Sequence, residues 1–276
     1  MGIANFMSQI NYYEDVKIIK KPLKYRVKSM LKIFLIIVTI VGCFWVATKF
    51  SAALTVGNLG SLIVYGDTSV KLGGNSWYAV TLGKYDSYEE AERVALGSTI
   101  QGASGFVWEQ DEMFWVVGNI YAKHDEADKV IWNMQGTNYA LDILEIKFPK
   151  FKLNFDMYDN ADMSLIDTAF EVFDEVYSLL YSYSIKFDKG EMSHLAVSSN
   201  ISGVRGEVKS VIVGVQNLIN RKNSSLMVVQ EYLVSMDEVL NQAILKTIDN
   251  SATNYSLKNA VATVVRLKYE MYEKLK

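Results

Sequence analysis

Two stretches of the chain, 36 residues apart, alternate apolar and polar positions in nearly the same way. Residues 78–85 read YAVTLGKY and residues 114–121 read FWVVGNIY. Each stretch opens on an aromatic residue, continues through β-branched residues to a Gly or an Asn, and closes on an aromatic, with a Glu-Ala pair following. Gly and Asn both tolerate a positive φ. A strand–turn–helix unit written twice in about 75 residues predicts a small, pseudo-symmetric α+β domain.

The alternation also assigns the two faces of the predicted sheet. One face carries Tyr78, Val80, Leu82, Phe114, Val116 and Gly118, and the other carries Ala79, Thr81, Trp115 and Val117. Apolar stripes in residues 91–95 and 127–134 predict a helix after each copy, both covering the first face. Further strands are expected at 105–109 and 140–146, with a hairpin through the acidic residues 110–112. The order is βαββαβ, a ferredoxin-like arrangement with one face left open.

Trp115 lies on that open face beside Thr81 and Val117. An exposed indole on a sheet usually contacts something. One interpretation is packing against the C-terminal helices or a neighbouring strand. The other is sugar stacking, in which the apolar face of a pyranose lies on the ring and the Thr81 hydroxyl bonds to a sugar hydroxyl. On the second interpretation the glycan-binding residues are Thr81, Trp115 and Val117.

Residues 160–276 repeat apolar positions at steps of three and four almost throughout. Breaks near 188–190, 222–225 and 249–251 divide this region into about four helices, and an antiparallel bundle is the simplest packing. Gly203, Gly206 and Gly214 would allow another helix to approach closely. We therefore expect the bundle to bind protein partners or to self-associate.

Residues 33–56 are almost continuously apolar, with Lys49 the only charge. As a helix they would extend roughly 36 Å, enough for a single membrane span. Residues 1–32 carry seven Lys and Arg against two acidic residues, which predicts a cytoplasmic N-terminus and an extracytoplasmic segment 57–276. A cleaved signal peptide ending near Ser51–Ala53 is the alternative, although the apolar run begins late for one.

The expected organisation has five parts: a cytoplasmic basic segment (1–32), a transmembrane helix (33–56), a linker rich in Gly, Asn and Ser (57–76), the α+β domain (77–149) and the helical bundle (150–276). The only cysteine, Cys43, falls in the apolar segment, so no intramolecular disulfide can form. A large exterior without disulfides is typical of a bacterial cell envelope rather than an animal cell surface.

The doubled Tyr-x-Val-x-Leu-Gly-x-Tyr…Glu-Ala pattern resembles that of SPOR (sporulation-related repeat) domains, over about residues 77–148. The resemblance implies binding to peptidoglycan, especially glycan strands stripped of their peptides, at division or engulfment septa through the open sheet face. The layout with a helical tail is similar to the stage II sporulation protein B type. Two positions depart from the family pattern: Thr81 stands where Gln is frequent, and Asn119 replaces the second Gly.

Charge and composition exclude several other functions. Residues 77–149 hold twelve Asp and Glu against five Lys and Arg, a balance of about −7, which disfavours nucleic acid as a partner. His124 and His194 have no second His or Cys at metal-ligand spacing, so no metal or cofactor is expected. Glu109, Asp111 and Glu112 resemble a glycosidase carboxylate set only superficially, since acidic residues in a hairpin turn are usually solvated. No phosphate-binding glycine loop occurs, and the chain is not expected to be an enzyme.

The leading hypothesis is therefore a membrane-anchored envelope protein that binds peptidoglycan through its sheet. The alternative is an envelope scaffold or assembly protein whose small domain binds another protein. A wall hydrolase with an unrecognised site is the third option. The first two hypotheses differ in one respect: glycan binding needs Trp115 to be accessible, whereas packing against the bundle would cover it.

Overall fold

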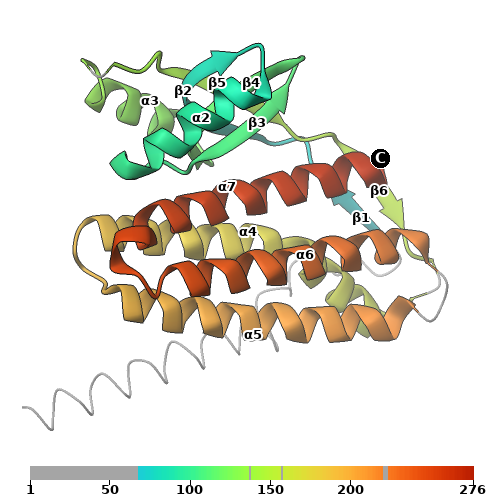
Figure 1. Ribbon diagram of the computed structural model, residues 1–276. Helices are drawn as coiled ribbons and strands as arrows, with labels where there is room; N and C mark the ends of the chain where they lie inside the picture. Colours follow the sequence, from blue (N-terminus) through green and yellow to red (C-terminus); the bar gives the residue numbers. More distant parts are fainter. Residues whose placement is uncertain (1–67, 137, 157, 220–222) are drawn as a thin grey trace, which may run out of the picture. The chain divides into compact units, whose positions relative to one another are not determined.

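The computed structural model describes residues 68–276 apart from 137, 157 and 220–222. Within these residues the chain forms a four-stranded sheet with two helices on one face, a short two-stranded ladder, and four long helices that pack as a bundle (Figure 1). We refer to the first part as the sheet domain and to the last as the bundle.

The sheet domain follows the predicted βαββαβ order. Its elements are β2 (Ser76–Tyr85), α2 (Tyr88–Ser98), the short helix η1 (Thr99–Gln101), β3 (Phe106–Gln110), β4 (Met113–Tyr121), α3 (His124–Asn133) and β5 (Asp142–Lys147). The strands lie in the order β3-β4-β2-β5, and all neighbours are antiparallel. The two repeated stretches, β2 and β4, thus form the centre of the sheet.

The register of β2 and β4 reflects the pseudo-symmetry of the repeat. Tyr78, which opens the first copy, pairs with Tyr121, which closes the second, and Tyr85 pairs with Phe114 in the same reciprocal way. One residue on each strand, Leu82 on β2 and Gly118 on β4, is left out of the pairing as a bulge. The central pair is therefore bent near its middle.

The bundle consists of α4 (Asn160–Asp188), α5 (His194–Ile219), α6 (Ser224–Lys246) and α7 (Asn250–Leu275). The breaks between these helices agree with those expected from the periodicity. The side chains of Asp159, Asn223 and Asp249 accept backbone hydrogen bonds at the N-termini of α4, α6 and α7, which fixes where these helices begin. Their core is apolar and fully buried, with Ile166, Phe173, Leu180, Ile201, Leu233, Met236 and Leu240 among its members.

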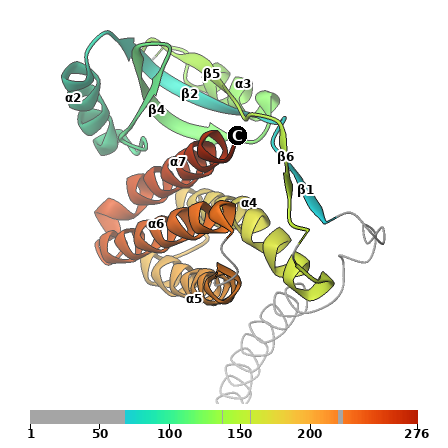
Figure 2. The same ribbon diagram turned by 90° about the vertical axis from the view of Figure 1, so that its right-hand side faces the viewer.

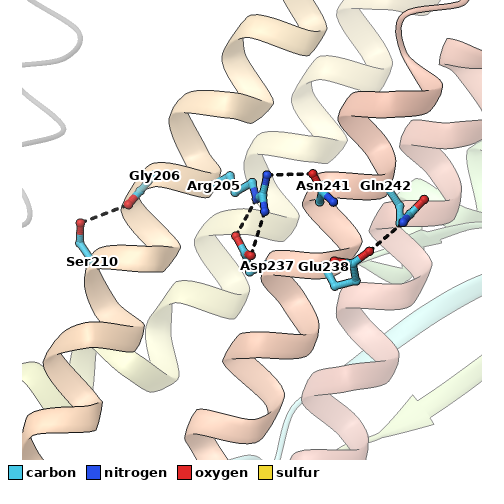
Figure 3. Close-up of polar contacts among 7 residues, drawn as sticks. All are labelled: Arg205, Gly206, Ser210, Asp237, Glu238, Asn241 and Gln242. Carbon is cyan, nitrogen blue, oxygen red and sulfur yellow. Dashed lines mark hydrogen bonds and ion pairs between the residues drawn. The ribbon is translucent and has the colours of Figure 1, made fainter.

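A polar network joins α5 to α6 on the outside of this core (Figure 3). Arg205 donates from Nε and Nη2 to the two carboxylate oxygens of Asp237, at 2.7 and 3.1 Å, and from Nη1 to Asn241 Oδ1 at 2.8 Å. A guanidinium matches a carboxylate in this two-point geometry, which a lysine ammonium cannot reproduce. The network fixes the rotation of α5 relative to α6.

The region expected to be a linker (57–76) contains a strand in its described part. β1 (Ser69–Leu72) pairs with β6 (Phe151–Asn154), which follows the sheet domain directly. Just after β1, the backbone at Gly73 (φ +71°) passes close to the backbone of Pro149. A Cβ at this position would lie 1.7 Å from the carbonyl oxygen of Pro149, so only Gly fits here. The two chain segments that enter and leave the sheet domain are thus held side by side.

Among the described residues, no helix has the length and apolar character needed to cross a membrane. The prediction of a fold that includes a transmembrane helix is therefore wrong for the structure as described, and the fold class is α+β, a small sheet followed by helices. The predicted segment, 33–56, lies outside the described residues.

The turn between β3 and β4 places two non-glycine residues in the left-handed region, Asp111 at φ 54° and Glu112 at φ 58°. This is the geometry of a two-residue type I′ hairpin, which favours Gly in the second position. We expect Glu112→Gly to stabilise the protein by about 0.5–1 kcal/mol, because the relief of left-handed strain exceeds the added entropy of the unfolded chain. Urea unfolding measures the change. Glu109→Gly, within β3, should instead destabilise, and a loss of stability in both variants would contradict the assignment.

Candidate functional site

The three residues predicted to bind glycan do not lie on an open face. Thr81 and Val117 are both 0% exposed, and Trp115 is partly buried against the hydrophobic core. The face that carries them is covered by the bundle: α7 lies against β4 and β3, between the sheet and the other bundle helices (Figures 1 and 2). Of the two interpretations of Trp115, the geometry therefore favours packing against the C-terminal helices.

The sheet and the bundle share one apolar core. Ala79, Val117 and Ile120 from the sheet belong to the same buried cluster as the core residues of α4, α5, α6 and α7. Aromatic rings from both parts also meet across this contact. Trp77 meets Tyr177 of α4 edge to face, with centroids 4.1 Å apart, and Trp108 meets Tyr269 of α7 at 5.7 Å. Contacts of this geometry add to the stabilisation from burial alone.

Three hydrogen bonds tie the bundle to backbone carbonyls of the sheet domain. The Tyr177 hydroxyl donates to Ile120 O at 3.1 Å, Lys258 Nζ donates to Gly102 O at 2.8 Å, and Asn259 Nδ2 donates to Ser104 O at 2.9 Å. Burial raises the pKa of the Tyr177 phenol, so the hydroxyl stays protonated and remains a donor. These bonds hold α4 and α7 at fixed positions along the sheet.

A buried cation lies in the same contact region. The Lys268 side chain is only 5% exposed, and its ammonium pairs with Asp174 of α4 at 2.5 Å. The same nitrogen lies 5.6 Å from the ring of Phe148 and 5.4 Å from that of Tyr272. A buried ammonium needs such partners, since removing its water is costly.

Two indole nitrogens in the covered face have no polar partner. Trp77 Nε1 and Trp115 Nε1 are both buried, and neither has a hydrogen-bond partner among the described residues. On one face of Trp115, Lys84 Nζ lies 4.8 Å from the ring centroid. A buried donor without an acceptor costs about 1–3 kcal/mol. The contact between sheet and bundle is therefore held mainly by apolar burial.

The two histidines contact different parts of the described chain. His124 Nδ1 lies 2.7 Å from Asp128 Oδ2, one helical turn away, and with Asp125 this makes a cluster of exposed side chains at the start of α3. His194 Nδ1 lies 3.3 Å from Thr247 O, so it contacts a different part of the chain. Asp111 and Glu112 are exposed in their turn.

Acidic residues along α4 and α5 have perturbed ionisation. Burial, together with repulsion from neighbouring carboxylates, raises the pKa of Glu171 and Glu175, and burial raises the pKa of Asp167. The largest effect is at Glu207 of α5, whose pKa is raised to about 7 by burial and by the charge of Glu175 across the helix contact. Local sequence patterns do not predict this pairing, because the two residues are 32 positions apart.

A cavity of about 150 Å³ lies on the other side of the sheet, beneath the helices of the sheet domain. Apolar side chains make up most of its wall, and Asn119 and Lys258 bring polar groups to it. The full lining is Val80, Leu82, Ser98, Gln101, Gly102, Ala103, Gly118, Asn119, Tyr121, Val130, Met134, Tyr139 and Lys258. No pattern in the sequence predicts this cavity, because its lining residues come from β2, β4, α2, η1, α3, α7 and the loops between them.

No family model matches this chain, and no curated protein or solved structure matches it either.

The Tyr177–Ile120 hydrogen bond provides a test of the contact between α4 and the sheet. We expect Tyr177→Phe to lower the free energy of unfolding by about 1–2 kcal/mol, because the buried carbonyl of Ile120 loses its side-chain donor. Tyr181→Phe is the matched control, since this partly buried ring stacks on Tyr177 at 5.8 Å. Urea unfolding compares the two variants, and equal losses would contradict a specific role for the Tyr177 hydroxyl.

Glu207 makes the stability of the bundle dependent on pH. Its pKa in the folded state, about 7, lies above the ordinary value of 4.5. Ionisation therefore favours the unfolded state, and this contribution lowers stability as the pH rises from about 4.5 through 7. Glu207→Gln should raise the Tm at pH 8 relative to the wild type and leave it nearly unchanged at pH 4. Glu191→Gln, at an exposed position, should show no such dependence, and a matching pH profile in both variants would refute the assignment.

Proposed function

We propose that this chain is a non-catalytic assembly protein that binds other proteins, with the sheet domain and the bundle acting together as one binding module. The observation that carries the proposal is the burial of the sheet face. Thr81 and Val117 have no exposed surface, and the face bearing them is part of the bundle's core.

Glycan binding by this face would require the bundle to leave it. Sugar stacking needs an accessible ring face and a hydroxyl that is available to the ligand. Trp115 instead packs against the core and lies under Lys84, and the Thr81 hydroxyl donates to Asp142 O at 3.2 Å. The docked arrangement thus supports the scaffold alternative over the peptidoglycan alternative.

Exposed apolar side chains support a protein partner. Large hydrophobic residues are exposed on several helices of the module, and a contiguous group of such residues would mark a protein-binding surface. They are Leu96, Ile100 and Trp132 in the sheet domain, and Leu195, Val213, Met227, Val234 and Leu245 in the bundle, each more than half exposed. A bound partner would cover some of these side chains.

The proposed absence of catalysis rests on the separation of the reactive groups. His124 belongs to α3 and His194 to α5, and each contacts a neighbour of its own. The carboxylates whose pKa values are most perturbed, Glu175 and Glu207, lie on α4 and α5, and burial and neighbouring carboxylates, not a histidine, cause the shifts. General acid–base catalysis needs such groups to converge on one reacting atom.

Thiol labelling tests whether the sheet face is covered. In a Cys43→Ser background, Thr81→Cys should react with a maleimide on the order of 100-fold slower than Ser164→Cys, an exposed position on α4. If the thiol at position 81 reacts only when the bundle moves away from the sheet, and this opening costs about 3 kcal/mol, its labelling is slowed by this factor. Equal labelling rates would overturn the proposal.

A second measurement addresses peptidoglycan directly. The full-length protein is pelleted with purified sacculi, either intact or stripped of peptides by amidase. We expect the wild type and Trp115→Ala to remain in the supernatant to the same extent. Pelleting that increases on stripped glycan and falls with Trp115→Ala would contradict the proposal and support the glycan alternative.

A further inference from the structure

The cavity beneath α2 and α3 has a buried floor and a rim that reaches the surface. Val80, Leu82 and Tyr121 lie on the floor, and each is at most 6% exposed. At the rim, Gln101 is exposed and Tyr139 is half-buried. Protein interiors contain few voids larger than a water molecule, so a space of about 150 Å³ that opens to the surface is a candidate binding site.

Small residues produce this space. Gly118 on β4 and Gly102 in the loop after η1 have no side chain, and Ala103 adds only a methyl group. An apolar cavity of this size takes up a molecule of the size of benzene. The lining includes the thioether of Met134 and the ring of Tyr121, and both groups contact aromatic rings favourably. The volume and the lining therefore suit a single aromatic ring.

The buried polar groups of the lining are already bonded within the chain. Ser98 Oγ donates to Ala95 O at 2.7 Å. The Asn119 side chain accepts from the Ile120 backbone at 2.9 Å and donates to the Tyr121 hydroxyl. A ligand deep in the cavity would therefore make mainly apolar contacts.

The lining, as far as the structure describes it, holds one charged residue, Lys258, and its charge is paired. Lys258 Nζ lies 3.2 Å from Asp188 Oδ2 and donates to Gly102 O at 2.8 Å. An anionic ligand would compete with Asp188 for this ammonium, and a cationic ligand would meet no carboxylate among the described lining residues. Burial of an unpaired charge is costly. The cavity therefore favours a neutral ligand.

Two neutral polar side chains at the rim remain available to a ligand. The Gln101 amide and the Tyr139 hydroxyl line the cavity, and neither makes a hydrogen bond within the described part of the chain. Each of these groups can both donate and accept. A hydroxyl on the ligand, which also donates and accepts, matches either of them.

We propose that this cavity binds a small neutral aromatic alcohol of the phenol class, with the ring on the apolar floor and the hydroxyl at the rim beside Gln101 and Tyr139. The inference goes beyond the assembly role and does not depend on it, because the cavity lies on the opposite side of the sheet from Thr81 and Trp115.

Ligand titration of the full-length protein tests the inference. The probe is phenol, and methyl NMR follows Val80, Leu82, Val130 and Met134. Saturable shifts of these methyl groups are expected, with a Kd below about 10 mM for so small a ligand. Benzoate and benzylammonium carry a similar ring with a negative or a positive charge. Both should bind at least about tenfold more weakly than phenol, because their charge would be buried without a partner.

A double variant tests where the hydroxyl lies. Gln101→Ala combined with Tyr139→Phe should weaken phenol binding by about 2- to 10-fold, because a neutral hydrogen bond is lost. Toluene, which has a methyl group in place of the hydroxyl, should bind the double variant and the wild type equally. An equal effect on phenol and toluene would contradict the assigned position of the hydroxyl.

A filled cavity provides the protein-side control. Ala103→Leu places added volume in the cavity wall and should abolish the shifts, whereas Ala140→Leu, at an exposed position, should leave them unchanged. Val130→Phe fills the cavity from α3 and replaces Ala103→Leu if that variant does not give a native spectrum. Absence of saturable shifts in the wild type, binding of benzoate as tight as that of phenol, or undiminished binding to a natively folded filled variant would each overturn the inference.

Discussion

The apolar face of the sheet must be kept from water, and the rest of the structure depends on how this is achieved. Trp77, Val117 and Ile120 present a surface that water would contact if α4 and α7 were absent. Burying such side chains is worth roughly 1.5–3 kcal/mol each. The helices α2 and α3 cover one face of the small sheet, and the bundle covers the other face and shares one core with it.

This constraint explains the placement of the polar groups between the two parts. Carbonyls at the edge of the contact find donors on bundle helices, as at Lys258 and Asn259 of α7, whereas the indole nitrogens of Trp77 and Trp115 remain unpaired within the described region. Each unpaired donor costs about 1–3 kcal/mol, and the burial of the large apolar rings that carry these donors offsets this cost. The hydrogen bonds fix where the helices lie along the sheet, and burial of the shared aliphatic and aromatic side chains supplies the attraction.

Local periodicity was sufficient to predict the elements of the sheet domain and the bundle helices. The alternation in residues 78–85 and 114–121 predicted the two strands and the face that α2 and α3 cover, because alternate residues of a strand point to opposite faces. The steps of three and four in residues 160–276 predicted the helices for the same reason. The short strand Ser69–Leu72 was missed, since four residues next to two glycines carry too little pattern.

Contacts between distant segments were not predictable. The pattern showed that Thr81, Trp115 and Val117 shared a face, but it did not show whether a ligand or the chain's own helices would cover that face. The cavity near Asn119 was hidden for a related reason, since it forms where a bulge in β4, the loop after α2 and a lysine of α7 meet. The lining of this cavity can be recognised only when these segments are seen together in the fold.

Native-state hydrogen exchange in increasing denaturant tests most directly whether the sheet and the bundle are one unit. The account holds that the sheet depends on α4 and α7 to cover its second face. The slowest amides of β4 and of α5 should then exchange through the same opening, with equal free energies and equal dependence on denaturant. Exchange of β4 through a separate opening of lower free energy, while α5 remained protected, would show that the sheet leaves the bundle independently and would contradict the account.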